Sequence, residues 1–313
     1  MPPALSVVVP LFDEEAVIEE MHSRLAAVLN RMSVEYEILM VNDGSRDGTA
    51  ELAKGICKRD SRVKLISFSR NFGHQVAISA GIERAVGEAV VVMDADLQDP
   101  PELIPEMVGK WREGNQVVYA VRKKRQGESF FKLVTASLFY KVLSRLTPVK
   151  IPQNTGDFRL MDRRVVDHLN RMHEKTRFLR GMVSWIGFRQ CQVEYTREKR
   201  HSGKTKYPLR KMLRFASDGI LSFSHAPLKV ASAFGFLSSG LSFAMIVYGI
   251  FIKFFFPESA IPGWASVFVA ILFLGGVQLI CLGIIGEYLG RVYEEIKGRP
   301  LYIVDEEINF GQQ

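Results

Sequence analysis

Acidic residues at alternate positions follow an apolar run in segment 90–99. After four apolar residues come Asp94, Asp96 and Gln98, each separated from the next by one apolar residue. In an extended chain alternate side chains share a face, so these three would project together. Their oxygen atoms suit Mg²⁺ or Mn²⁺. The same run fits a strand end closed by a turn at Asp99-Pro100 equally well, so the surrounding chain must decide between the two.

Short apolar runs alternate with helix-like segments up to residue 121. Several runs are continuously apolar, which is typical of parallel strands buried on both faces. We expect strands at 5–10, 38–42, 63–68, 89–93 and 117–121, and helices at 14–30, 49–58, 74–85 and 101–112. This order predicts an α/β doubly wound fold with its ligand site at the carboxyl ends of the strands.

Polar residues follow each of the first four predicted strands, and we expect these strand exits to meet in one crevice. Gly44 and Gly48 permit close backbone approach, and Asp43 can accept hydrogen bonds from a base or ribose. Segment 42–49 also fits a helix-entry loop capped by Ser45 or Asp47, and capping is compatible with ligand binding.

Two common nucleotide-binding motifs are absent from the sequence. No G-x-G-x-x-G follows the first predicted strand, which argues against a Rossmann dinucleotide site. Gly203-Lys204-Thr205 resembles the end of a P-loop, but Glu198 stands where that motif needs its first glycine. A P-loop nucleoside triphosphatase is therefore excluded.

Two long segments lack Asp, Glu, Lys and Arg. They span 23 residues at 230–252 and 25 residues at 262–286. Each can cross about 30 Å of hydrocarbon, so we predict a two-helix transmembrane hairpin rather than a pair of core helices. Basic residues flank the outer ends of both segments, while the connecting loop offers only Lys253, which predicts cytoplasmic termini. Segment 1–12 is too short for a signal peptide.

The positive charge is concentrated just before the membrane. Segment 197–214 carries eight Lys or Arg and one Glu, which equals the net charge of +7 of the whole chain. It can attract lipid headgroups, orient the spans or bind an anionic substrate. We expect a cytosolic domain at 1–207, an interfacial amphipathic helix at 208–228, the membrane hairpin at 229–287 and a cytosolic helix and strand tail at 288–313. Within that tail, 299–304 predicts a strand that returns to its own or a neighbour's domain.

Several motifs together resemble a known family. Val7-Val8-Val9-Pro10, Asn42-Asp43-Gly44-Ser45 and Asp94-Ala95-Asp96 resemble family-two glycosyltransferases with a GT-A fold. Segments 70–75, 94–102, 155–160 and 203–207, with the two-span tail, are more specifically similar to polyisoprenyl-phosphate glycosyltransferases. The chain looks most like bacterial undecaprenyl-phosphate (bactoprenol) glucosyltransferases, and dolichol-phosphate mannose synthases share the catalytic part.

This resemblance implies an inverting, metal-dependent transfer of a hexose to undecaprenyl phosphate, on the cytoplasmic face of a bacterial inner membrane. The implied donor is UDP-glucose. Asp94 would lie beside its ribose and diphosphate, and Asp96 and Gln98 would ligate Mg²⁺ or Mn²⁺. The implied donor-binding residues are Pro10, Phe12, Glu14, Asp43, Gly44, Ser45 and Asp94.

The implied acceptor is a lipid phosphate, whose second pKa of about 6 leaves it largely ionised near neutral pH. A proton-abstracting role for Asp157 is then unnecessary, and that residue can instead orient the acceptor or balance Arg159. Segment 178–188, with Arg180 and Trp185, fits either the acceptor side or a packed helix. Arginine forks and lysines suit phosphate, and the candidate phosphate ligands are Arg122, Arg125, Lys132, Arg200 and Lys204.

Three alternatives remain to be distinguished. The donor can be GDP-mannose or a UDP-linked amino sugar, because pocket shape decides sugar choice. A processive polysaccharide synthase is disfavoured, since the chain lacks that group's Gln-x-x-Arg-Trp signature and predicts only two spans. A catalytically silent membrane scaffold is disfavoured by the intact acidic motif. We expect a homo-oligomer, for example a tetramer, and no nucleic-acid partner.

Overall fold

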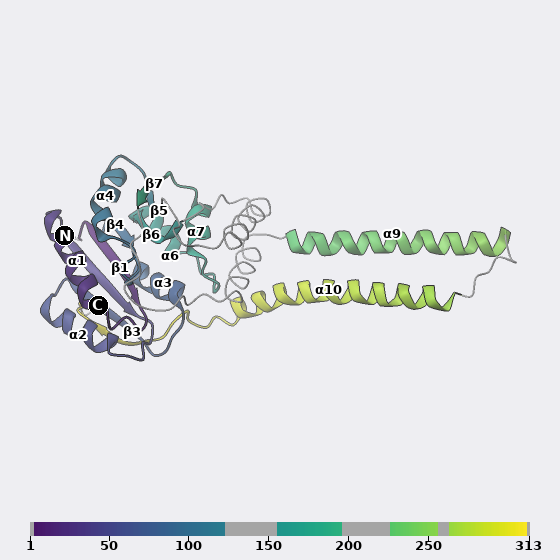
Figure 1. Cartoon of the computed structure of the whole chain (residues 1–313), viewed down its shortest axis with the longest axis horizontal. Coiled ribbons are helices and arrows are strands. Elements are labelled where there is room, and N and C mark those ends of the chain that lie inside the picture. The colour runs from purple at the N-terminus through teal and green to yellow at the C-terminus, as the bar shows by residue number, and fades with distance from the viewer. Residues whose placement is uncertain (1–2, 123–154, 196–225, 256–262, 312–313) are drawn as a thin grey trace. The chain divides into compact units, whose positions relative to one another are not determined.

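The computed structural model describes residues 3–122, 155–195, 226–255 and 263–311 (Figure 1). The chain divides into two compact units. The first comprises Met1–Arg145, Val149–Gly219 and Arg299–Gln313, and the second comprises Leu146–Pro148 and Ile220–Gly298. Each unit is considered separately below.

The first unit is built on one eight-stranded sheet with the strand order β7-β5-β6-β4-β1-β2-β3-β8. Strands β1 to β4 run parallel where they pair with one another, as do β5 and β7, whereas β6 and β8 pair antiparallel with their neighbours. The elements are β1 (Leu5–Leu11), α1 (Ile18–Arg31), β2 (Tyr36–Asn42), α2 (Thr49–Arg59), β3 (Val63–Phe68), α3 (His74–Arg84), β4 (Ala89–Val92), a 3₁₀ turn (Pro101–Leu103), α4 (Ile104–Arg112), β5 (Val117–Arg122), β6 (Thr155–Asp162), α6 (Arg163–Asn170), α7 (Leu179–Ile186), β7 (Gln190–Tyr195) and β8 (Val304–Ile308).

Alternate residues of the central strands pack against helices on opposite faces of this sheet. In β2, Ile38 and Met40 belong to a core that includes side chains of α1, α2 and α4, whereas Val41 packs with Ala77 and Ala80 of α3. All seven residues of β1 and of β2 are buried, which explains their largely apolar sequences, and the buried polar residues Ser6 and Glu37 pair with each other at 2.6 Å. The predicted mainly parallel sheet flanked by helices is therefore confirmed.

The strand order reverses beside β1, which pairs with β2 on one side and with β4 on the other. In open α/β sheets a ligand crevice forms outside the carboxyl ends of the strands at such a point. The polar motifs of the sequence lie in the segments that follow β1, β2 and β4.

The second unit contains two long apolar helices, α9 (Ala226–Phe255) and α10 (Trp264–Ile296), which contact each other. Within them, Pro227–Met245 and Val269–Ile296 are long and apolar enough to cross a membrane. Large apolar side chains such as Phe236 and Leu279 are exposed, as expected of helices surrounded by lipid. The second helix extends ten residues past the predicted end at 286, and the predicted interfacial helix lies outside the described residues except for 226–228, which begin α9.

The C-terminal segment returns to the sheet of the first unit. Strand β8 pairs antiparallel with β3, with Leu65 opposite Ile308 and Phe68 opposite Val304. This strand lies within the predicted tail, but it begins at Val304, the last residue of the segment 299–304 in which it was expected, and continues to Ile308.

Candidate active site

Two acidic residues meet at the carboxyl edge of the sheet because β6 runs antiparallel to β4. Val92, the last residue of β4, pairs with Arg159 of β6. Continuing that register places Asp94, two residues beyond β4, opposite Asp157, which lies near the start of β6. The carboxyl end of β4 and the amino end of β6 therefore lie at the same edge of the sheet.

His74 lies between these two carboxylates. It is the first residue of α3 and follows Gly73, whose φ of 111° favours glycine at this turn. Its Nε2 atom is 3.4 Å from Oδ1 of Asp94 and 3.5 Å from Oδ2 of Asp157. Burial opposes the charged imidazole, but the hydrogen bond to Asp157 and the two carboxylate charges raise the pKa of His74 to about 9. A cationic His74 therefore separates two carboxylates that would otherwise repel each other.

Asp157 is also held by Arg180 of α7 and by Gln75 of α3. Arg180 donates from Nε to Oδ1 at 3.0 Å and from Nη2 to Oδ2 at 3.3 Å, and Gln75 donates from Nε2 to Oδ2 at 3.0 Å. Burial by itself would raise the pKa of Asp157, but Arg180, His74 and Arg159 outweigh it and hold that pKa well below its usual range. Asp157 is thus a buried, ionised carboxylate.

Arg159 lies beside Asp157 in β6, with Nη2 3.7 Å from Oδ1 of Asp157. Burial lowers the pKa of Arg159 to about 10, although Asp157 opposes that change. The expectation that Asp157 balances Arg159 is therefore supported by geometry, but Arg180 is the closer cation.

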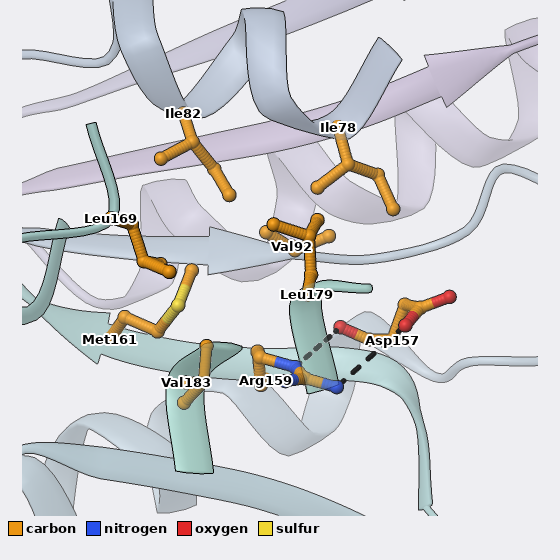
Figure 2. Close-up of a pocket in the computed structure, with 9 residues that line it drawn as sticks. All are labelled: Ile78, Ile82, Val92, Asp157, Arg159, Met161, Leu169, Leu179 and Val183. Atoms are coloured by element: carbon orange, nitrogen blue, oxygen red, sulfur yellow. Dashed lines mark hydrogen bonds and ion pairs between the residues drawn. The ribbon is translucent and has the colours of Figure 1, made fainter. Parts of the chain in front are cut away.

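An apolar pocket lies against this pair, and Figure 2 shows Arg159 turned toward Asp157 at its edge. Seven apolar side chains complete its lining: Ile78, Ile82, Val92, Met161, Leu169, Leu179 and Val183. These side chains exclude water from one side of the two charges, which explains why the charges are buried and paired with each other.

Asp94 is the more accessible of the two acids, with 28% of its side chain exposed against 9% for Asp157. Burial raises the pKa of Asp94, and His74 opposes that rise. Its Oδ1 atom is buried without a hydrogen-bond partner. This oxygen faces the cationic His74 at 3.4 Å and keeps a lone pair for a hydrogen bond from a ligand.

The extended conformation predicted for residues 94–98 is wrong. Strand β4 ends at Val92, and Leu97 has a left-handed φ of 59°. The cause is local, because Oδ1 of Asp96 accepts the backbone N–H of Gln98 at 3.1 Å and so closes a turn two residues ahead. Asp96 is partly exposed and Gln98 is buried, so regular alternation does not place the two side chains on one face.

The oxygen donors present fit a divalent cation that is shared with a substrate. Among the residues that the structure describes, no three His, Cys, Asp or Glu side chains form a metal site by themselves. Mg²⁺ commonly uses only one or two protein carboxylates and completes its shell with water and substrate phosphates. Partly exposed Asp96, two residues after Asp94 in the chain, suits that arrangement.

The exit of β2 is tied to the loop that follows β3. Oδ1 of Asp43 accepts the backbone N–H of Phe72 at 2.7 Å, and Oδ2 accepts that of Gly73 at 3.0 Å. Gly44 has a φ of 65°, and a Cβ atom there would lie 2.5 Å from the carbonyl carbon of Arg70. Asp43 and Gly44 therefore shape this loop, and direct contact of Asp43 with a ribose or base remains a prediction.

The exits of β1 and β2 contact each other through backbone and side-chain hydrogen bonds. Ser45 Oγ accepts the N–H of Asp13 at 3.1 Å, and Thr49 Oγ1 accepts the N–H of Glu14 at 2.8 Å. The N-cap of α2 is Gly48, so the predicted cap by Ser45 or Asp47 is wrong, although Oδ1 of Asp47 accepts the N–H of Thr49, the first residue of the helix, at 3.0 Å. The remaining predicted donor residues, Pro10 and Phe12, lie at the end of β1 and just after it.

The predicted acceptor residues are only partly within the described chain. Arg122 is the last residue of β5, opposite Tyr195 of β7. The other four, Arg125, Lys132, Arg200 and Lys204, lie outside the described residues.

Three residues of the acid cluster had no assigned role in the sequence. His74 and Gln75 stand in the motif 70–75 that carried the family resemblance, and that motif was the available signal. Arg180 lay in a segment that fitted either the acceptor side or a packed helix. The structure agrees with the packed helix, since α7 packs on α6, and it also shows that Arg180 reaches Asp157, whereas a place on the acceptor side stays a prediction.

Comparison with known proteins identifies the family. The sequence model of glycosyl transferase family 2 matches residues 6–169. The chain is 54% identical to the uncharacterized glycosyltransferase YkcC of Bacillus subtilis over 96% of this chain and 93% of that protein. It is 40% identical to the bactoprenol glucosyl transferase of Shigella phage SfV over 97% of this chain and 98% of that protein.

A similarity to a solved structure was also found. It is glucosyl-3-phosphoglycerate synthase from Mycobacterium tuberculosis in complex with Mn²⁺, UDP and glucosyl-3-phosphoglycerate, with a TM-score of 0.48 and 20% identity, covering 70% of this chain and 78% of that one. The family match and the full-length relatives decide the assignment: the chain is a glycosyltransferase and belongs to glycosyl transferase family 2.

Proposed function

We propose that this enzyme transfers glucose from UDP-glucose to the phosphate of undecaprenyl phosphate, with inversion, at a membrane surface. The full-length similarity to a bactoprenol glucosyl transferase carries this proposal, because it includes the apolar helices as well as the catalytic unit. The acid cluster at the carboxyl edge of the sheet supplies the chemical site.

The donor is proposed to bind at the exits of β1, β2 and β4. Pro10, Phe12 and Glu14 would contact the base and ribose, together with the loop of Asp43, Gly44 and Ser45. Asp94 lies at the neighbouring exit with one unbonded oxygen. Backbone N–H groups in such loops and a cationic His74 suit an anionic diphosphate.

Asp96, with Gln98, would hold Mg²⁺ or Mn²⁺ beside the donor diphosphate. When bound, the ion offsets negative charge on the departing nucleoside diphosphate. The exposure of Asp96 and its place two residues after Asp94 support a cation at this place.

Asp157 is proposed to be an orienting residue and not a general base. Its pKa lies well below the usual range, and its two oxygens accept three hydrogen bonds from Arg180 and Gln75. The acceptor phosphate needs no base, because it is already largely ionised near neutral pH. Its oxygen forms the new bond to the anomeric carbon while the bond from that carbon to the UDP oxygen breaks, and UDP leaves with the electron pair.

The acceptor would be bound from the membrane side by cationic residues. Arg122 at the end of β5 is the described member of this group, and Arg125, Lys132, Arg200 and Lys204 remain predicted members. The helices α9 and α10 would anchor the enzyme in the cytoplasmic membrane with both termini in the cytosol. A homo-oligomer also remains a prediction.

The test offers the purified full-length protein undecaprenyl phosphate with UDP-glucose, GDP-mannose or a UDP-amino sugar in parallel reactions. Each reaction is run with Mg²⁺, with Mn²⁺ and with EDTA. We expect a glycosylated lipid from UDP-glucose that depends on the metal. Equal amounts of product with and without EDTA would show that the reaction needs no metal. Preferential use of GDP-mannose would show that the donor is not UDP-glucose. Extension of a free glycan without any lipid product would overturn the proposed acceptor.

A further inference from the structure

The segment Arg299–Phe310, here called the C-terminal tail, is docked along the outer edge of the sheet in the first unit. Besides the pairing of β8 with β3, Nδ2 of Asn309 donates to the carbonyl oxygens of Cys57 and Val63 at 2.9 and 2.7 Å. Glu306 forms an ion pair of 2.8 Å with Lys54 of α2. The tail thus covers a strand edge that would otherwise be open to pairing with another chain.

The tail also binds the last turn of α3. The hydroxyl of Tyr302 donates to Glu83 at 2.8 Å, and Glu307 pairs with Arg84 at 2.7 Å. The first turn of the same helix carries His74 and Gln75, which contact Asp94 and Asp157. An 11-residue helix is rigid, so the contacts at one end restrict the side chains at the other.

A second connection runs from Tyr302 through aromatic rings to the loop of residues 69–73. The ring of Tyr302 stacks on Phe68 with centroids 4.9 Å apart, and Phe68 packs edge-on against Phe72 at 5.7 Å. The carbonyl oxygen of Ile303 accepts the N–H of Ser69 at 3.1 Å. The far side of this loop binds Asp43 through the N–H groups of Phe72 and Gly73.

We propose that Tyr302 is a positioning residue for the donor site, acting through the stack of its ring on Phe68 and loop 69–73. The tail follows α10 after only a few residues, so the chain that leaves the second apolar helix directly supports the donor-binding loops. This inference rests on the proposed function, since it assumes that a nucleotide sugar binds at the exits of β2 and β4.

The test compares Tyr302→Ala and Tyr302→Leu with Tyr302→Phe in the full-length protein. Glu306→Gln is the matched control, because it alters the same tail but its partner Lys54 lies on α2. We expect KM for UDP-glucose to rise about 3- to 10-fold in the Ala and Leu variants, the range expected for losing one aromatic pair. KM for undecaprenyl phosphate should change less than about 2-fold, and Tyr302→Phe and Glu306→Gln should resemble the wild type, because the aromatic stack is retained in both.

Hydrogen exchange provides a readout that does not depend on turnover. The amides of Phe72 and Gly73 should exchange about 3- to 10-fold faster in the Ala and Leu variants, while amides of β1 stay protected. Unchanged exchange at these two amides, or an equal loss of protection throughout the sheet, would overturn the proposal. If the wild type transfers no sugar, the proposed function fails, and the exchange experiment still decides the positioning role.

Discussion

Removal of the Arg180 side chain should destabilise the first unit, because Asp157 loses its nearest cation and keeps neutral Gln75 and two more distant cations. Removing one member of an isolated buried ion pair costs about 3–5 kcal/mol. Here Gln75 at 3.0 Å, His74 at 3.5 Å and Arg159 at 3.7 Å remain around the carboxylate. We therefore expect Arg180→Ala to lower the free energy of unfolding by about 2–3 kcal/mol, less than for an isolated pair.

The assay is thermal unfolding of the full-length protein near neutral pH. For a domain of this size the loss corresponds to a fall in Tm of about 5–10 °C. Arg180→Lys keeps the positive charge but loses the pair of hydrogen bonds from the guanidinium group to Asp157. We expect it to lower the free energy of unfolding by about 1 kcal/mol. Arg164→Ala is the matched control, because its ion pair with Asp162 lies on the surface and should contribute less than about 1 kcal/mol.

The same pair predicts a pH dependence. Because the folded-state pKa of Asp157 is depressed, its stabilisation is present above the ordinary carboxyl pKa of 3.8 and is lost as the pH falls below it. The difference in free energy of unfolding between the wild type and Arg180→Ala should therefore become smaller in acid. A double-mutant cycle with Asp157→Asn should give a coupling of about 1.5 kcal/mol or more. If Arg180→Ala melts within about 1 °C of the wild type, or if the coupling is about zero, then Arg180 does not stabilise the buried Asp157.

Three further predictions concern the same site. Asp96→Asn should lower kcat about 100-fold or more without lowering Tm, because a metal ligand contributes several kcal/mol to charge stabilisation but Asp96 is partly exposed; steady-state rates and melting curves test this. Protonated His74 should stabilise the fold below about pH 6.5, and this contribution should be lost as the pH rises through about 9, so His74→Gln should flatten the dependence of Tm on pH across that range. Gly44→Ala should lower the free energy of unfolding by about 2 kcal/mol or more, because Gly44 has a positive φ and a Cβ there would meet the backbone of Arg70. The control is Gly109→Ala in α4, where a Cβ meets open space, and it should leave Tm unchanged or raise it.

The sequence predicted the first five strands because each is an apolar run bounded by polar residues. Their observed ends differ from the predicted ones by no more than two residues. Strands β6 and β7 were not predicted, because both mix apolar with charged or polar side chains, including Asp157 and Arg159, and give no continuous apolar signal. Their partners lie far along the chain, so local pattern could not indicate their pairing.

The sequence indicated the two acids of the cluster but not its other members or its geometry. Asp94 and Asp157 were identified by motif, yet their proximity depends on the antiparallel register of β6 with β4. His74, Gln75 and Arg180 join them from two helices, and nothing in local spacing indicates that meeting. The alternation argument failed at Asp96 because its side chain binds the backbone of Gln98, an option that a short acidic side chain always has near a strand end.

The most direct test of sugar transfer to a lipid phosphate is the ³¹P NMR spectrum of undecaprenyl phosphate incubated with the purified enzyme, UDP-glucose and Mg²⁺. We expect the phosphomonoester signal of the lipid to be replaced by a phosphodiester signal as UDP appears. Release of UDP with an unchanged lipid phosphomonoester signal would show that the sugar goes elsewhere, and it would contradict the proposed acceptor.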